Sequence, residues 1–205
     1  MAPPRPSDWH PLADADPVPG DPDGLSGYAD GLTRRAHALA ATGDTVKAAD
    51  TGPLWTGLAA AMYDEHRAEL PPRLTEMGER HSGAAAALKT YAGHLQEAQA
   101  TSLAALHDAQ DADHRRIQAE AGVREYLDHQ QNENRQRRMA EAEGDHDYQR
   151  QPWTGPDWYG RLDQAEGDLA AARKKLAGAV AGRDDAARAC AAALTGLLLD
   201  DQTGR

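Results

Sequence analysis

Three side chains near the middle of the chain have the chemistry and spacing of metal ligands. His107, Asp111 and His114 are four and three residues apart, so on a helix all three would lie on one face. Imidazole and carboxylate groups are ligands that zinc accepts. The sequence contains no His-Glu-x-x-His motif and no obvious fourth ligand, and such spacing is common on solvated, charged helices. We therefore expect no metal site and no cofactor, and keep a helical metal-binding enzyme only as the weakest of three functional classes.

No other group of residues predicts catalysis. The sequence lacks a Gly-x-Ser-x-Gly nucleophile motif, a phosphate-binding loop and a dinucleotide-binding fingerprint. Its carboxylates instead stand four residues before arginines, as in Glu120 with Arg124 and Glu133 with Arg137, which predicts ion pairs on helices. Cys190, the only cysteine, lies on an apolar row. We expect it to be a small core residue, with an intermolecular disulfide as the alternative. We expect the protein not to be an enzyme.

Charge and hydropathy exclude two classes of partner. The formal net charge of −11 disfavours nonspecific binding to nucleic acid or to an anionic membrane. No apolar run reaches the roughly 18 residues that a bilayer span requires, so we expect no stable membrane insertion. The first residues, Met1 to Pro6, are followed by no apolar segment, and we expect no cleaved signal peptide of the Sec type.

Proline divides the chain into the elements that must position any functional residue. Seven of the 12 prolines lie within residues 1–22, and none lies in 73–151 or 157–205. Proline is excluded from helix interiors but accepted at the first helical position, so the two proline-free segments predict long helices. Residues 1–20 are rich in proline and aspartate and predict a disordered tail.

Two helices are predicted before residue 128. The first begins at Asp21 and Pro22, which suit the cap and first helical positions, and runs to about residue 49. The second begins near Pro53 with Gly52 as its cap, and Pro71-Pro72 should kink or briefly interrupt it.

Apolar residues at helical spacing mark one row on each of these helices. The predicted rows are Leu25, Tyr28, Leu32, Ala36 and Leu39 on the first helix, and Leu54, Leu58, Met62, His66 and Leu70 on the second. We expect Tyr28, Tyr63 and Tyr91, which lie on apolar rows, to be core residues.

A third helix is predicted to start at Gly155-Pro156-Asp157. Its apolar row alternates steps of three and four residues, which is typical of a coiled-coil seam. The row comprises Leu162, Ala165, Leu169, Ala172, Leu176, Ala179, Arg183, Ala187, Cys190, Leu194 and Leu197. Because many of these residues are alanine, each turn would bury little area, and length or a partner must compensate.

The turn between the first two helices carries a recognisable motif. Trp55-Thr56-Gly57 continues as Leu58-Ala59-Ala60-Ala61-Met62-Tyr63, a pattern that resembles the WxG family of small helical hairpins handled by type VII secretion systems. Residues 20–110 also resemble the N-terminal targeting domain of actinobacterial polymorphic toxins. That resemblance is carried by three stretches in order: Gly20-Asp21-Pro22-Asp23-Gly24-Leu25, Glu69-Leu70-Pro71-Pro72-Arg73-Leu74, and Ala87-Leu88-Lys89-Thr90-Tyr91-Ala92 ahead of Leu95-Gln96-Glu97-Ala98-Gln99.

The resemblance implies which residues would be recognised. In that family the Trp and Gly of the turn help to form a recognition surface, which places Trp55 and Gly57 in this role. Gly57 would leave room for the indole, and a partly exposed Trp is a rigid anchor. The family's Tyr-x-x-x-Asp/Glu export signal is matched only by Tyr159 and Asp163. The structural alternatives are a hydrophobic staple for Trp55 and ordinary first-turn residues for Tyr159 and Asp163.

Two further Trp-x-Gly triplets precede the last helix. They are Trp153-Thr154-Gly155 and Trp158-Tyr159-Gly160. Their position predicts either a repeat of the hairpin turn or a chance recurrence, and the sequence does not separate these alternatives.

Together these observations predict an all-α fold. We expect an elongated antiparallel helical hairpin or bundle of about three long helices with coiled-coil-like packing. Its parts would be a tail at 1–20, a WxG-type hairpin at 21–127, a polar helix end and loop at 128–155, a coiled-coil helix at 156–199 packing back on the hairpin, and a tail at 200–205.

The predicted function is that of a type VII secretion substrate or the targeting leader of a secreted toxin. Such a protein would be made in the cytoplasm and exported by a non-Sec route. Its partner would be the secretion machinery or a small helical protein, and a homodimer is also considered. In toxins of this class a catalytic part follows the targeting domain, so we expect either a toxin leader or a stand-alone substrate. The alternative function is an intracellular coiled-coil adaptor or secretion chaperone.

Overall fold

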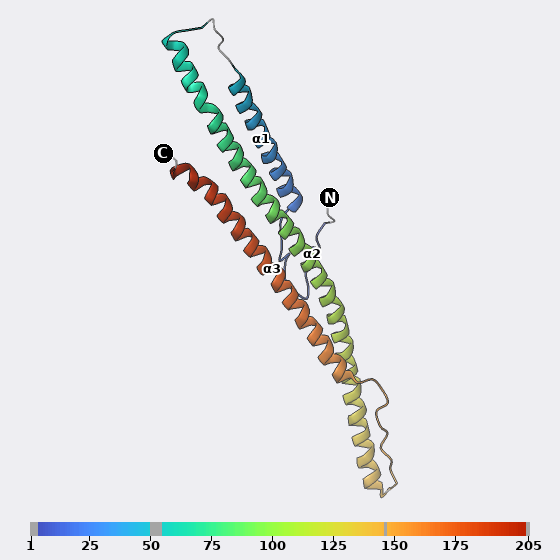
Figure 1. Ribbon diagram of the computed structural model, residues 1–205. Coiled ribbons are helices and arrows are strands. Elements are labelled where there is room, and N and C mark those ends of the chain that lie inside the picture. Colours follow the sequence, from blue (N-terminus) through green and yellow to red (C-terminus); the bar gives the residue numbers. More distant parts are fainter. Residues whose placement is uncertain (1–3, 50–54, 146, 204–205) are drawn as a thin grey trace. The chain divides into compact units, whose positions relative to one another are not determined.

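A computed structural model describes residues 4–49, 55–145 and 147–203, with the side chains of 199–203 left aside. These residues form three α-helices and no strand (Figure 1). Helix α1 spans Pro22–Ala48, α2 spans Leu58–Glu143 and α3 spans Trp158–Thr203. The predicted all-α fold with three long helices is therefore confirmed.

Aspartate caps start two of the helices. Asp21 accepts a hydrogen bond from the Gly24 amide at 2.9 Å, and Pro22 takes the first helical position, as the sequence predicts. Asp157 caps α3 in the same way, because its side chain accepts a hydrogen bond from the Gly160 amide at 3.0 Å. Helix α2 ends at Glu143, and the next residue, Gly144, has a φ of 76°, the left-handed conformation usual just after a helix.

Helix α2 differs from the prediction at its start, and it lacks the brief interruption that was one of the two expectations for Pro71-Pro72. It begins at Leu58, so the expected start near Pro53 is wrong for residues 55–57, while Gly52-Pro53 itself lies outside the described residues. The helix also continues through Pro71 and Pro72 without interruption. Buried Pro71 packs against α1, where a Cβ on Gly43 would lie 3.8 Å from the Pro71 carbonyl oxygen. This packing offsets the roughly 3 kcal/mol that a proline costs inside a helix.

The chain divides into two compact units, and both α2 and α3 contribute to each. Unit 1 contains Val18–Gln99 and the part of α3 from Val180 onward, and unit 2 contains Pro4–Pro17 and Ala100–Ala179. Each unit has its own packing and is described separately below.

In unit 1, α1 runs antiparallel to the first part of α2 (Figure 1). Its contact cluster comprises Ala29, Leu32 and Ala85, with Ala84 and Leu88 packed against it. Leu32 and Ala36 of the predicted row are buried, whereas Tyr28 is 60% exposed, so its placement in the core was wrong. Ala29 takes the buried position instead. Farther along, the two helices approach closely, since a Cβ on Gly78 would lie 3.3 Å from the Ala36 carbonyl oxygen.

In unit 2, the second part of α2 packs antiparallel against α3 through small residues. The buried residues of α2 include Ala105, Ala109, Ala112 and Ala119, and those of α3 include Ala165, Leu169, Ala172, Leu176 and Ala179. The predicted row of α3 is therefore its buried or half-buried face. Cys190, on the same row within unit 1, is buried as predicted.

The N-terminal segment is packed, which corrects the predicted disordered tail. We call residues 4–17 the strap. In unit 2 the Trp9 side chain of the strap is fully buried, and in unit 1 Val18 is fully buried as well. Gln99 of α2 donates hydrogen bonds to the carbonyl oxygens of Val18 and Gly20 at 3.2 and 3.0 Å. The composition predicts that this segment cannot form a core of its own. It does not predict that α2 and α3 offer a surface on which the segment packs.

Candidate recognition surface

Trp55, Thr56 and Gly57 lie immediately before α2. The Gly57 carbonyl oxygen accepts the first hydrogen bond of the helix, from the Ala61 amide at 3.1 Å, so Gly57 is the cap residue. Its φ is 103°, a conformation that side-chain-bearing residues rarely adopt. A Cβ on Gly57 would meet no atom within 4 Å. The expectation that Gly57 makes room for the indole is therefore wrong, and the backbone angle is what requires glycine.

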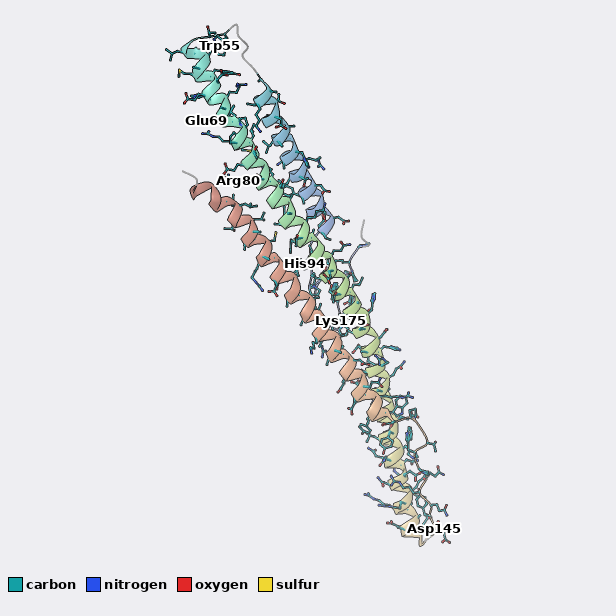
Figure 2. All side chains as sticks on the ribbon, in the orientation of Figure 1. Trp55, Glu69, Arg80, His94, Asp145 and Lys175 are labelled. Carbon is teal, nitrogen blue, oxygen red and sulfur yellow. The ribbon has the colours of Figure 1, made fainter. Side chains whose placement is uncertain are left out.

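Trp55 is 45% exposed and packs against one aromatic ring. Its ring centroid lies 5.3 Å from that of Tyr63, at an interplanar angle of 51°. Tyr63 is itself 46% exposed, so its prediction as a core residue was wrong. This contact fixes the indole on the first turns of α2 without burying it. Figure 2 shows Trp55 at the start of that helix.

The largest apolar side chains of the following turns are also exposed. Leu58 is 83% exposed, Met62 57% and Leu70 48%. With Trp55 and Tyr63 they form what we call the exposed strip. The sequence predicted the row of Leu58, Met62, His66 and Leu70 correctly as a pattern, but it faces solvent in the structure and not α1. Leu54, the first residue of the predicted row, lies outside the described residues.

Small and polar residues form the opposite face of these turns. Ala60, Pro71 and Gly78 are buried there, and Asp64 and Arg67 are half-buried and form an ion pair at 3.2 Å. Close approach of α1 needs small side chains, so the long ones are left on the outside. A cluster of large exposed apolar side chains marks an interaction site more often than chance placement does.

An apolar groove lies near the strip within unit 1. It has a volume of about 390 Å³, and its lining includes Leu32 of α1, Met77 of α2, and Leu197 and Leu198 of α3. Met77 is 48% and Leu198 71% exposed. All three helices thus contribute apolar side chains to the lining of this groove.

The other Trp-x-Gly triplets have a different environment in unit 2. Trp153 is half-buried, lies edge-on against Tyr126 with centroids 5.6 Å apart, and donates a hydrogen bond to the Pro156 carbonyl oxygen at 3.1 Å. Trp158 packs on Gly122, where a Cβ would lie 2.1 Å from the indole. Both tryptophans therefore anchor the segment between α2 and α3 and, unlike Trp55, are not held out toward solvent.

Tyr159 and Asp163 lie on the first turns of α3, in unit 2. The Tyr159 ring is edge-on to Tyr126 at 6.0 Å and is 48% exposed, and Asp163 is exposed. Trp55 and Gly57 belong to unit 1, so the structure does not place the four predicted residues in one compact unit. A role of Tyr159 and Asp163 in export stays a prediction.

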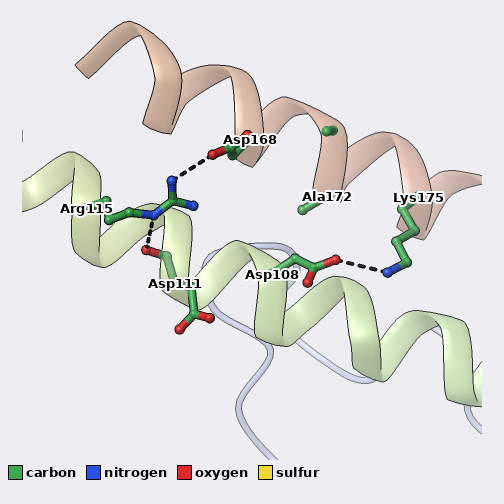
Figure 3. Close-up of a pocket in the computed structure, with 7 residues that line it drawn as sticks. Asp108, Asp111, Arg115, Asp168, Ala172 and Lys175 are labelled. Carbon is green, nitrogen blue, oxygen red and sulfur yellow. Dashed lines mark hydrogen bonds and ion pairs between the residues drawn. The ribbon is translucent and has the colours of Figure 1, made fainter. Parts of the chain in front are cut away.

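A charged hollow of about 320 Å³ lies between α2 and α3 in unit 2. Two ion pairs cross it, Lys175 with Asp108 at 2.9 Å and Arg115 with Asp168 at 2.7 Å, on either side of Ala172 (Figure 3). On each helix the aspartate precedes the basic residue along the chain, and because the helices are antiparallel, each aspartate faces a basic residue of the other helix. The pairs therefore specify how the helices align, and they use the carboxylates and cations that could otherwise act on a ligand.

The described residues contain no group of three or more His, Cys, Asp and Glu side chains that could hold a metal ion. Among the earlier candidates, the His114 ring nitrogen Nε2 contacts the Gln118 amide at 2.8 Å. Two predicted ion pairs are also replaced. Glu120 pairs with Arg116, and Glu133 accepts hydrogen bonds from the Tyr148 hydroxyl at 3.1 Å and the Gln151 amide at 2.8 Å.

Two pKa shifts accompany these contacts. Burial, together with the hydrogen bond to Glu133, raises the pKa of Tyr148. The hydrogen bond to Asp113 raises the pKa of Arg116, which keeps that guanidinium charged. Neither shift produces a group that would exchange protons near neutral pH, as general acid–base catalysis needs.

Comparison with known families places this geometry in context. A family model described as "Putative T7SS secretion signal domain", in which T7SS denotes the type VII secretion system, matches residues 13–199. This chain belongs to that family. Neither a curated protein nor a solved structure matches it. The match covers nearly all of both units and supports the role of a type VII secretion substrate, exported by a non-Sec route and recognised by the secretion machinery.

None of the described helices combines the length and apolar character that a membrane span requires. What sequence reasoning missed is that the strip faces outward. The signal was present, because Ala60, Pro71 and Gly78 form a second row of small residues at the same helical spacing.

Proposed function

We propose that this secretion-signal domain is recognised through the exposed strip at the start of α2. The carrying observation is that Trp55 is only 45% exposed and fixed by Tyr63, while the large apolar residues after it face solvent. A half-exposed aromatic anchor next to flexible methionine and leucine side chains has the composition of protein-interaction hot spots.

The receptor in this proposal is a protein of the type VII secretion machinery or a small helical partner protein. An amphipathic helix suits a strip of apolar residues on one helix, because side chains at i, i+4 and i+7 can interlock. A homodimer through the same strip is the alternative arrangement. We further propose that the domain acts by binding alone, without enzymatic activity, and that it targets either a toxin or itself for export.

Export from a native-like host tests the proposal. Trp55→Ala and Met62→Glu should reduce the secreted fraction severalfold while circular dichroism shows unchanged helicity. Both side chains are exposed, so the cost in folding stability should stay within about 0.5 kcal/mol. Loss of export would then report recognition and not unfolding.

Matched controls come from exposed apolar residues of α2 in unit 2. Met139 is 56% and Ile117 51% exposed, close to the values of the residues tested. Met139→Ala and Ile117→Glu should be exported like the wild type. Equal export of all four variants would exclude the strip as the recognised surface. If the wild type itself is retained in the cell, an intracellular coiled-coil adaptor or chaperone is favoured.

A further inference from the structure

Two sets of contacts hold the strap in unit 2. They are made by the buried Trp9 side chain and by the ion pair between Arg5 and Asp16. Trp9 is fully buried, and its Nε1 donates a hydrogen bond to the Pro6 carbonyl oxygen at 2.9 Å. The Arg5 guanidinium lies 4.8 Å from the Trp9 ring centroid and binds both carboxylate oxygens of Asp16, at 2.6 and 2.7 Å. These contacts give the strap a shape of its own.

The strap also contacts residues that the two helices place in its path. Arg5 donates a hydrogen bond to the Ser102 hydroxyl of α2 at 3.0 Å, and Ser102 is fully buried. Leu12 packs against a cluster in which Ala109 and Ala112 come from α2 and Leu169 and Ala172 from α3. The strap is therefore specific for this place, through one hydrogen bond from a cation and one leucine on a floor of small residues.

The strap is not helical and lies on a floor of small residues. Leu12 is the side chain that packs on the cluster from α2 and α3, and the Trp9 indole is fully buried within unit 2. Prolines at positions 4, 6, 11 and 17 keep the strap from becoming helical. In unit 1, α1 takes the place beside the other two helices, whereas the strap packs beside them in unit 2.

We propose that unit 2 contains a peptide-binding groove between α2 and α3, whose intramolecular ligand is the strap, and that strap and groove separate reversibly. The recognised chemistry is a non-helical segment with arginine, tryptophan and leucine at the spacing of Arg5, Trp9 and Leu12, and with a turn after Trp9. The strap contacts α2 through side chains, as in the hydrogen bond from Arg5 to Ser102, so its release leaves the backbone hydrogen bonds within the helices in place.

Binding in trans tests the groove. A synthetic peptide of residues 4–17 is titrated into the full chain carrying Trp9→Ala. The strap of this chain lacks the buried indole. We expect this peptide to bind at least about tenfold more tightly than the same peptide with Trp9→Ala, because buried aromatic anchors dominate such sites. Equal affinity of the two peptides, or no binding of either, would overturn the proposal. A full chain carrying Arg5→Ala, with Trp9 kept, provides a second host that should give the same order.

Hydrogen exchange tests reversibility in the wild-type chain. The Leu12 and Ala13 amides donate to the Trp9 carbonyl oxygen at 2.8 and 3.0 Å and report the closed strap. We expect them to be protected yet to exchange at least about tenfold faster than the helical amides of residues 105–112, as a local opening requires. Exchange at the same rate as those helical amides would mean that the strap leaves only on unfolding, which would refute a separable ligand.

Discussion

Gly57 is held by its backbone angle, and this separates it from Gly93 in the same unit. Its φ is 103°, whereas Gly93 lies within α2, and neither would bring a Cβ within 4 Å of another atom. Gly57→Ala should therefore destabilise the start of α2 by about 1–2 kcal/mol through backbone strain. Gly93→Ala should stabilise the helix by about 0.5–1 kcal/mol. Urea unfolding of both variants measures the difference, and a stabilising Gly57→Ala would refute the assignment.

Tyr148 should titrate above the ordinary pKa of a tyrosine. Burial and the hydrogen bond to Glu133 raise its pKa above the ordinary value of about 10. A raised pKa means that the folded state binds the proton more tightly. The contribution to stability is therefore complete below about pH 10 and is lost as the pH rises through the pKa of the folded state.

A spectrophotometric titration checks this shift. The signal of Tyr148 is obtained as the difference between the wild type and Tyr148→Phe. Glu133→Gln should move the pKa of Tyr148 back toward its ordinary value, because the acceptor loses its charge while burial remains. A Tyr148 signal at the ordinary tyrosine pKa of about 10 in the wild type would contradict the structure.

Ion pairs across α2 and α3 should hold the two helices in one alignment. The two pairs are one heptad apart, and a slip of one heptad would bring Asp108 opposite Asp168 in one direction or Arg115 opposite Lys175 in the other. Lys175→Asp should cost about 0.5–1 kcal/mol, since both partners are partly exposed. Adding Asp108→Lys should restore most of that loss.

Thermal unfolding of the single and double variants measures this coupling. Lys47→Asp serves as the control, because Lys47 is 63% exposed and its contact to Asp44 within α1 is long, at 3.9 Å. A double variant that is as unstable as the sum of its single changes would show that the pair contributes nothing to the alignment.

The elements could be predicted because their signals are local. Asp21-Pro22 and Asp157 mark helix starts by capping chemistry, and the row of α3 follows from spacing alone. The face of α2 could not be predicted by the same reasoning. One row of large apolar residues, with Met62, and one row of small residues, with Gly78, both have helical spacing. The close approach of α1 requires small side chains, so the row with Gly78 is the buried one.

The strap shows the limit of composition as a guide. Proline and aspartate predict that residues 1–20 cannot form a core of their own, which is correct as far as it goes. The strap meets Ser102 through Arg5 and the cluster of Leu169 through Leu12, and no local pattern encodes contacts so far apart in sequence. The exposed Trp55 was predictable as a recognition candidate only through its family motif, because spacing alone placed it next to core residues.

At the scale of the whole molecule, the two units should open separately although two helices contribute to both. Among the buried leucines, Leu32 of unit 1 and Leu169 of unit 2 have similar exposed fractions, 9% and 6%, and make a matched pair for substitution. Replacing either with alanine should cost about 2–5 kcal/mol in its own unit. Leu32→Ala should speed amide exchange in α1 while leaving residues 162–176 of α3 unchanged, and Leu169→Ala should do the reverse.

Mass spectrometry of hydrogen exchange distinguishes this behaviour from a single cooperative transition. Accelerated exchange everywhere in both variants would show that α2 and α3 transmit unfolding along their whole length. Separate opening would have a functional consequence, because the exposed strip of unit 1 could then be presented whether the strap of unit 2 is closed or open. A Trp9→Ala chain should in that case be exported as well as the wild type, while Trp55→Ala is not.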